Sequence, residues 1–486
     1  MGPLDNMNLQ HSYATELDEL VSQVKPQPLK NARVVSINQS LASDLGLPDA
    51  YLDQQTLLEL LFAHDSQLTR CAVAQKYGGH QFGHWNPDLG DGRGLLLGEI
   101  ISPAGQRWDL HLKGAGQTPY SRFADGRAVL RSTIREYLAS EALHHLGIPS
   151  SRALCLVTSD EPVYREKAEP GAMLVRVCQS HLRFGHFEYF YHSGQGQKLD
   201  KLFDYSFKYH FQNCLLADNP YAAMLTKIVN DTAAMIAKWQ AYGFNHGVMN
   251  TDNMSIHGIT FDFGPYAFLD DFKPDFICNH SDPQGRYSFD SQPGIGLWNL
   301  NALAHAFSPY MDRDEITQAL QSYEPSLLRE YGELMRQKCG LEAKHSNNAA
   351  IINEWLDMLA SEQQDYTMMF RQLCDFDPAA EGSSLRDQFI DRPRFDRWAT
   401  LLKQTLAQQD QSKTQRRQSM LGVNPKIILR NYLAQQVIEE AEQGNFTMFE
   451  EFLAALANPF AEMPEHAKFS APPPNWGKHL EISCSS

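Results

Sequence analysis

HGVMNTDNMSIHGITFDFG, residues 246–264, is the stretch that decides the fold of this chain. Within it, Asn253 and Asp262 offer the hard oxygen ligands that Mg²⁺ prefers, and substrate phosphates would complete the octahedral shell of the ion. Asp262, Phe263 and Gly264 form a D-F-G tripeptide, which by itself occurs by chance. The stretch therefore predicts a metal site for a phosphate substrate only if phosphate-binding features accompany it.

Three such features precede the stretch. LGDGRG, residues 89–94, places three glycines before a predicted strand, where the backbone could approach phosphates, although an ordinary turn has the same pattern. Lys113 ends the next predicted strand, where its ammonium group could reach a phosphate or simply face solvent. Glu136 lies on the following predicted helix, where it could pair with Lys113 or close a capping box with Thr133.

The order of these features is that of the protein kinases: glycine-rich loop, strand lysine, helix glutamate, H-x-x-x-x-x-x-N and D-F-G. One part of the pattern is missing. When the sequence is aligned on His246 and Asn253, the catalytic aspartate position is occupied by Val248, which cannot accept a proton. Asp252 is the only nearby carboxylate in this loop, so any general base must be built around it.

The sequence predicts an α+β protein with a protein-kinase-like, two-lobed fold, a largely helical C-terminal lobe and extensions. Residues 1–184 would form the α+β lobe with the glycine-rich loop, residues 185–465 the mainly helical lobe with the catalytic and metal-binding loops, and residues 466–486 the tail. Periodicity predicts a hairpin of strands over residues 95–100 and 108–113. It also predicts a helix over residues 131–146 and a long helix that ends at Gly243.

Composition excludes several classes of protein. With 43% apolar and 21% charged residues, the chain is near the average of globular proteins. A formal net charge of −16 repels nucleic acid and anionic membranes, so a polyanionic ligand requires a local basic pocket. No apolar stretch is long enough to span a membrane, and no secretory signal is evident. The eight cysteines lack C-x-x-C spacing, which favours a reducing, cytoplasmic location.

Long blocks of this sequence resemble the selenoprotein O family, whose members have a kinase fold and are similar to pseudokinases. The matching blocks are YGGHQFGHWNPDLGDGRGLLLGE (77–99) and residues 110–154, 246–272 and 277–304, and the resemblance extends over nearly the whole chain. It implies transfer of AMP from ATP to Ser, Thr or Tyr hydroxyls of proteins, with self-modification as one outcome. It also implies that ATP binds in the reverse orientation to that in kinases and that pyrophosphate leaves.

The resemblance implies a set of ATP-binding residues: Gly90, Gly92, Arg93, Lys113, Asp125, Gly126, Arg176, Arg183 and Asp262. Glu136 would orient Lys113, while Arg176 and Arg183 would hold the distal phosphates. Without the resemblance, each of these arginines could equally form a surface ion pair.

The resemblance also implies the metal ligands and the base. Asn253 and Asp262 would bind Mg²⁺, or Mn²⁺ because both are hard ions, and Asp252 would accept the proton. Cys484 stands where some relatives carry selenocysteine, and the resemblance suggests a regulatory disulfide with Cys278. The alternative is an inert, buried Cys278 and a frayed tail.

Two other functions stay open at this stage: a phosphotransferase acting on proteins or small molecules, and an ATP-binding scaffold without turnover. Val248 argues against the first, and the retained metal ligands argue against the second. His80 and His84 have the i, i+4 spacing of metal ligands on a helix. The glycines around them argue against a helix there, so packing or hydrogen bonding is favoured for both histidines.

Overall fold

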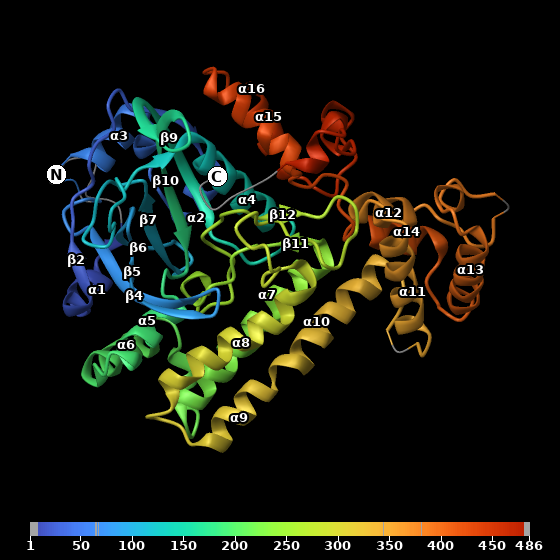
Figure 1. Ribbon diagram of the computed structural model, residues 1–486, viewed down its shortest axis with the longest axis horizontal. Helices are drawn as coiled ribbons and strands as arrows, with labels where there is room; N and C mark the ends of the chain where they lie inside the picture. Colours follow the sequence, from blue (N-terminus) through green and yellow to red (C-terminus); the bar gives the residue numbers. More distant parts are fainter. Residues whose placement is uncertain (1–7, 64–65, 67, 344, 381, 481–486) are drawn as a thin grey trace.

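The computed structural model describes residues 8–63, 66, 68–343, 345–380 and 382–480. The first part of the described chain forms a large antiparallel sheet with a few helices, and the rest is almost entirely helical (Figure 1). The predicted α+β class is therefore confirmed. No described helix combines the length and the apolar character that a membrane crossing requires.

The sheet has ten strands, and its main path runs in the order β2-β4-β6-β7-β10-β9-β3. The strands are β1 (Leu9–Gln10), β2 (Val21–Gln23), β3 (Arg33–Ile37), β4 (Val73–Gln81), β5 (His84–Gly90), β6 (Gly94–Ile101), β7 (Arg107–Lys113), β8 (Ala128–Val129), β9 (Arg152–Tyr164) and β10 (Ala168–Cys178). The predicted hairpin is the β6–β7 pair, in which Gly94 is opposite Lys113. This register brings the glycine-rich turn between β5 and β6 next to the strand lysine.

Both faces of the sheet are covered, which explains the continuous apolar run of β6. Leu95 and Leu97 pack in one core with α2 (Gln39–Leu45) and α3 (Gln54–Phe62). Leu96, on the opposite face, packs in a second core with α4 (Leu130–His145), the helix predicted over residues 131–146. A strand buried on both faces has no need of polar alternation.

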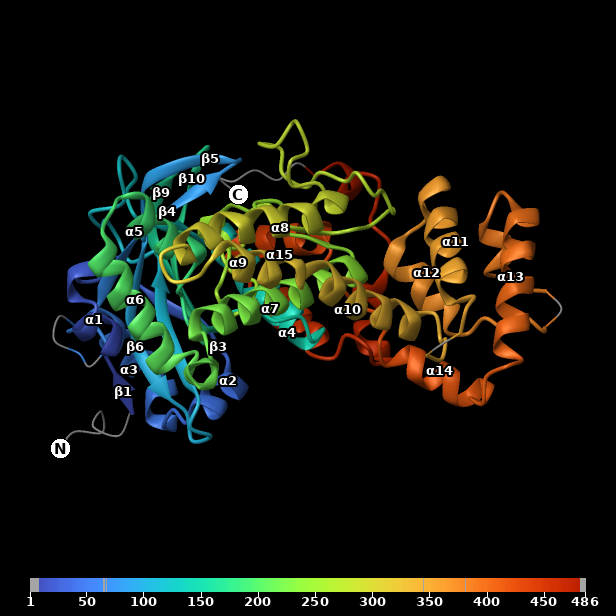
Figure 2. The ribbon, with the colours of Figure 1, turned by 90° about the horizontal axis from the view of Figure 1, so that it is seen from below.

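Thirteen further α-helices are described. They are α1 (Ser12–Glu16), α5 (Phe184–His192), α6 (Gly196–Tyr209), α7 (Pro220–Tyr242), α8 (Gln292–Ala304), α9 (Arg313–Gln321), α10 (Tyr323–Lys338), α11 (Asn348–Ser361), α12 (Tyr366–Leu373), α13 (Arg392–Leu406), α14 (Lys413–Leu421), α15 (Asn431–Glu442) and α16 (Thr447–Leu456). Helices α11 to α14 gather at the end remote from the sheet, around Trp355 and Trp398 (Figure 2). Helices α15 and α16 return to pack on α4.

Helix α7 leads into residues 246–264, the stretch that contains the predicted metal-binding motif. Its first turn is capped by Asn219, whose side chain accepts hydrogen bonds from the next backbone N–H groups, and it ends at Gly243 with φ of 71°, as predicted. Strands β11 (Phe244–Asn245) and β12 (Ala267–Phe268) pair on either side of residues 246–264. The indole of Trp239 stacks on His246 and donates a 2.9 Å hydrogen bond to Thr260 Oγ1. Trp239 thus contacts both ends of the stretch 246–264, His246 near its beginning and Thr260 near its end.

Replacing Trp239 by alanine is expected to lower the free energy of unfolding by about 3–5 kcal/mol, because the substitution leaves a large cavity and removes the hydrogen bond to Thr260 Oγ1. Trp239 is 1% exposed, whereas Trp476 is 47% exposed and serves as the matched control. Urea denaturation of both variants measures the difference. Equal, small effects of Trp239→Ala and Trp476→Ala would contradict this support for the stretch.

Candidate active site

A cavity of about 470 Å³ is enclosed by the β5–β6 turn, the end of β7, the loop at residues 120–127 and the stretch 246–264. Its walls contain the following residues predicted from the sequence: Gly90, Gly92, Arg93, Lys113, Asp125, Gly126, Arg176, Arg183, Asp252, Asn253 and Asp262. Glu136 lies behind this wall, in contact with Lys113. The structure therefore brings the predicted nucleotide and metal residues together at one site.

Cationic side chains outnumber carboxylates around this cavity, although the chain as a whole has a net charge of −16. The cationic residues are Arg93, Lys113, Arg122, Arg127, Arg165, Arg176 and Arg183. The acidic residues are Asp88, Asp91, Asp125, Asp252 and Asp262. The cavity is the kind of local basic pocket that a polyanionic ligand of this acidic protein requires.

A buried chain of ion pairs crosses the back of the cavity. Lys113 Nζ lies 2.5 Å from Glu136 Oε2, and the other oxygen of Glu136 accepts from Arg176. The guanidinium of Arg176 also pairs with Asp262 Oδ1 at 2.7 Å, and Arg183 pairs with the second oxygen of Asp262. Glu136 is fully buried and Arg183 is 2% exposed. The two arginines are therefore not surface ion pairs.

These contacts set the protonation states of the ion-paired side chains. Burial lowers the pKa of Lys113 to about 8, although Glu136 opposes this effect. Burial raises the pKa of Glu136, but Arg176 and Lys113 outweigh it and hold the pKa at about 2. In the same way, Arg183 and Arg176 overcome the effect of burial and keep the pKa of Asp262 well below its usual range. Both carboxylates are ionised at neutral pH.

The capping-box interpretation of Glu136 is wrong. Helix α4 begins at Leu130, so Thr133 lies inside the helix rather than at its N-cap. The Thr133 hydroxyl donates to the carbonyl oxygen of Val129 at 2.8 Å. Glu136 is therefore available to pair with Lys113 and Arg176.

Asp252 lines the cavity together with Val248, which occupies the position of the kinase catalytic aspartate. Asp252 is 8% exposed, and its Oδ1 has no hydrogen-bond partner within the described part of the chain. Burial raises the pKa of Asp252 to about 7, although nearby Arg183 counteracts this. A Cβ atom on Gly79 would lie 2.6 Å from Asp252 Oδ1, so the absence of a side chain lets β4 lie against this carboxylate.

The residues predicted to bind a metal, Asn253 and Asp262, fit a hard divalent cation. Asn253 Nδ2 donates to the carbonyl oxygen of Val248 at 3.0 Å, which leaves Asn253 Oδ1 as its ligand atom. Asp262 has φ of 59°, a left-handed conformation that non-glycine residues rarely adopt and that is frequent at functional sites. Both side chains line the cavity, and their oxygens match the preference of Mg²⁺ and Mn²⁺.

Comparison with known proteins identifies the family of the chain. Residues 3–457 match the family described as "Protein adenylyltransferase SelO". The chain belongs to the SelO family. It is 59% identical to "Protein nucleotidyltransferase YdiU" of Pseudoalteromonas atlantica, over 99% of this chain and all of that protein. Proteins with the same description from Erwinia tasmaniensis and Pseudomonas aeruginosa are 52% and 50% identical, over 99% and 100% of this chain and all of theirs.

The family inferred from the motifs is thus confirmed, and so is the class of enzyme, a nucleotidyltransferase. Sequence reasoning nevertheless missed part of the site in this SelO family member. Arg165 forms a two-pronged ion pair with Asp125, at 2.8 and 2.9 Å, and both line the cavity. Arg165 lies between β9 and β10, and no sequence pattern marks it. Asp125 therefore orients the guanidinium of Arg165 at the cavity.

Gly126 is required by the backbone of the loop that carries Asp125. Its φ is 70°, and a Cβ atom there would lie 2.1 Å from the carbonyl carbon and oxygen of Gly116. No side chain fits this contact. Gly126 therefore keeps the loop closed over the cavity that it lines.

The predicted redox pair is described only in part. Cys278 is buried, and its thiol contacts the carbonyl oxygen of Pro265, directly after the D-F-G tripeptide. Cys484 lies outside the described residues. Cys278 and Leu480, the last described residue, line one surface cavity. The disulfide stays a prediction.

Replacing Asp252 by asparagine is expected to stabilise the protein at alkaline pH. Between the usual pKa of 3.8 and about 7, the folded protein binds more protons at Asp252 than the unfolded chain does, so stability falls as the pH rises through this window. Asp252→Asn removes this fall in stability at high pH, because an amide side chain does not titrate. Melting temperatures in metal-free buffer should be several degrees higher for Asp252→Asn than for wild type at pH 8, and converge towards pH 4. The exposed Asp275→Asn is the control, and a constant difference between pH 4 and 8 would contradict the argument.

Proposed function

We propose that this protein transfers AMP from ATP to Ser, Thr or Tyr hydroxyls of proteins, itself included, and releases pyrophosphate. The observation that carries the proposal is the buried chain from Lys113 through Glu136, Arg176 and Asp262 to Arg183, at the wall of a basic cavity. We also infer a kinase-like, two-lobed arrangement that divides near residues 184 and 465. The spacing of the cysteines favours a reducing compartment such as the cytoplasm.

ATP would bind with its phosphates among the cationic side chains. In AMP transfer, pyrophosphate is the leaving group, and the negative charge that develops on it needs cationic partners. Lys113, Arg176 and Arg183 supply buried charges at the back of the cavity. This distribution supports the reversed orientation of ATP, in which the distal phosphates lie at the buried end.

Asn253 and Asp262 would hold Mg²⁺ or Mn²⁺ through their oxygen atoms. When bound, the ion neutralises phosphate charge. Arg176 and Arg183 fix both oxygens of Asp262 in place, and the Val248 carbonyl fixes the amide of Asn253. These residues therefore orient the ligand atoms before the nucleotide arrives.

Asp252 would accept the proton of the attacking hydroxyl. As the hydroxyl oxygen bonds to the α-phosphorus, the bond from that phosphorus to the oxygen bridging to the β-phosphate breaks. Pyrophosphate leaves with the electron pair of the broken bond. Asp252 suits this task because it lines the cavity and burial raises its pKa to about 7, so it can take up a proton near neutral pH.

Labelled ATP tests the proposal directly. The protein is incubated with a Ser-, Thr- and Tyr-bearing carrier protein and ATP that carries radioactive phosphorus in the α or the γ position. Label on protein from the α position alone, with pyrophosphate released, is the expected result. Asp262→Ala should abolish it, whereas Asp275→Ala, which replaces an exposed aspartate of the next segment, should not. Label from the γ position alone would indicate a phosphotransferase, and no label with no pyrophosphate would indicate a scaffold.

Removing the guanidinium of Arg176 is expected to lower AMP transfer about as severely as removing the carboxylate of Asp262. Arg176→Ala should lower the initial rate of AMP transfer by at least about 10³-fold, the smallest effect typical of an arginine that stabilises charge in phosphoryl transfer. Arg33→Ala, which breaks only an exposed ion pair with Asp160, is the control. Because Arg176→Ala also leaves buried carboxylates, its melting temperature must be measured first. A folded Arg176→Ala variant with unchanged turnover would remove Arg176 from the mechanism.

A further inference from the structure

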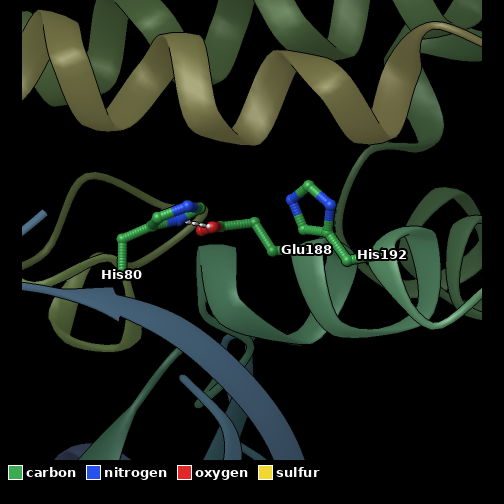
Figure 3. A group of neighbouring side chains, drawn as sticks. All are labelled: His80, Glu188 and His192. Atoms are coloured by element: carbon green, nitrogen blue, oxygen red, sulfur yellow. Dashed lines mark hydrogen bonds and ion pairs between the residues drawn. The ribbon is translucent and has the colours of Figure 1, made fainter. Parts of the chain in front are cut away.

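A second group of metal-ligating side chains lies outside the nucleotide cavity. His80 is near the end of β4, while Glu188 and His192 lie four residues apart on α5 and therefore on one face of that helix. One ligand atom of each residue lies within 4.8 Å of those of the other two. Figure 3 shows the imidazole of His80 directed at the carboxylate of Glu188, with His192 on the other side of Glu188. The predicted neighbour of His80, His84, is not part of the group.

Glu188 is the unusual member of this group. Its side chain is fully buried, and its Oε2 hydrogen-bonds His80 Nδ1 at 2.5 Å. Its other oxygen, Oε1, is buried and has no hydrogen-bond partner in the described part of the chain. A buried carboxylate that is only half satisfied is costly and calls for a further cation or donor.

The surroundings suit a bound ion. The ring centroids of Trp85 and His192 are 4.6 Å apart, and those of Trp298 and His80 are 5.3 Å apart, so apolar rings border the group. His192 is exposed and gives the group access to solvent. An apolar border with one open side limits hydration while leaving a path for entry.

We propose that His80, Glu188 and His192 bind a divalent first-row transition-metal ion, best represented by Zn²⁺. Two imidazole nitrogens and one carboxylate, with water in the fourth position, are a common zinc ligand set, whereas Mg²⁺ prefers oxygen ligands alone. Tetrahedral ligand atoms at about 2.0–2.2 Å from zinc are about 3.3–3.6 Å from one another. The 2.5 Å contact between His80 and Glu188 must therefore widen by about 1 Å, and the exposed His192 must turn inward.

The ion would connect β4 and α5 close to the proposed base. The backbone N–H of His80 donates to Thr251 Oγ1 at 2.7 Å, and Thr251 directly precedes Asp252. Gln81, next to His80, also reaches Asp252 Oδ2 at 3.4 Å. An ion on His80 would thus restrain the strand that lies against Asp252. The site itself does not depend on the proposed AMP transfer.

Zinc titration of the full-length protein tests the proposal. Protein stripped with a chelator and returned to metal-free buffer is titrated with Zn²⁺ in the presence of excess Mg²⁺, with isothermal calorimetry against a competing chelator. One equivalent should bind, and the melting temperature should rise with the concentration of Zn²⁺. His192→Ala should weaken binding by at least about 100-fold, the upper end of what outer-shell substitutions cost, and abolish that rise.

Matched variants separate this site from other binding. His84→Ala removes an exposed histidine of the same hairpin, and Asp262→Ala removes a ligand of the nucleotide site; both should bind Zn²⁺ like wild type. Glu188→Gln, which keeps the shape of the side chain, should lose binding as His192→Ala does. Absence of a one-equivalent site in the wild type would overturn the proposal. Equal affinity of the wild type and a folded His192→Ala variant, or loss of binding in a folded Asp262→Ala variant, would also overturn it.

Discussion

The buried ion-pair chain at the back of the cavity is the constraint on which the rest of the site depends. Three cations and two carboxylates share it, so each carboxylate contacts two cations and no charge is left alone. Removing either carboxylate would leave buried cations uncompensated, which typically costs about 3–5 kcal/mol. Its members come from β7, α4, β10, the residue before α5 and the D-F-G tripeptide. These ion pairs therefore fix the sheet against the loop that carries the proposed metal ligands.

The same arrangement reconciles an acidic protein with a polyanionic substrate. A net charge of −16 repels nucleotides from most of the surface, but the cavity collects arginines from segments far apart in the sequence. Arg122 and Arg127 follow β7 in the loop that closes on Gly126, and Arg165 lies between β9 and β10. Local potential, rather than net charge, decides where a nucleotide binds.

Much of the fold was predictable where one local pattern dominated. The β6–β7 hairpin, α4 and α7 follow from short turns, a clear helical period and a glycine C-cap. Helices α2 and α3 were missed. In α3 the buried Leu57, Leu60 and Leu61 have the i, i+3, i+4 spacing of a helix face, but a short apolar run is easily taken for a buried strand. The length of β9 and β10 was also missed, because pairing between neighbouring strands decides where each strand ends.

Motif spacing alone predicted which residue types would serve a nucleotide and in what order, because the spacing within each motif is a local property of the chain. It indicated Lys113, Glu136, Asn253 and Asp262, and it showed the valine at position 248. That Arg176 joins two carboxylates, and that Glu188 contacts His80, 108 residues away in the sequence, is visible in the folded protein alone. Contacts between distant segments depend on how the sheet and helices pack, and no pattern within one segment encodes them.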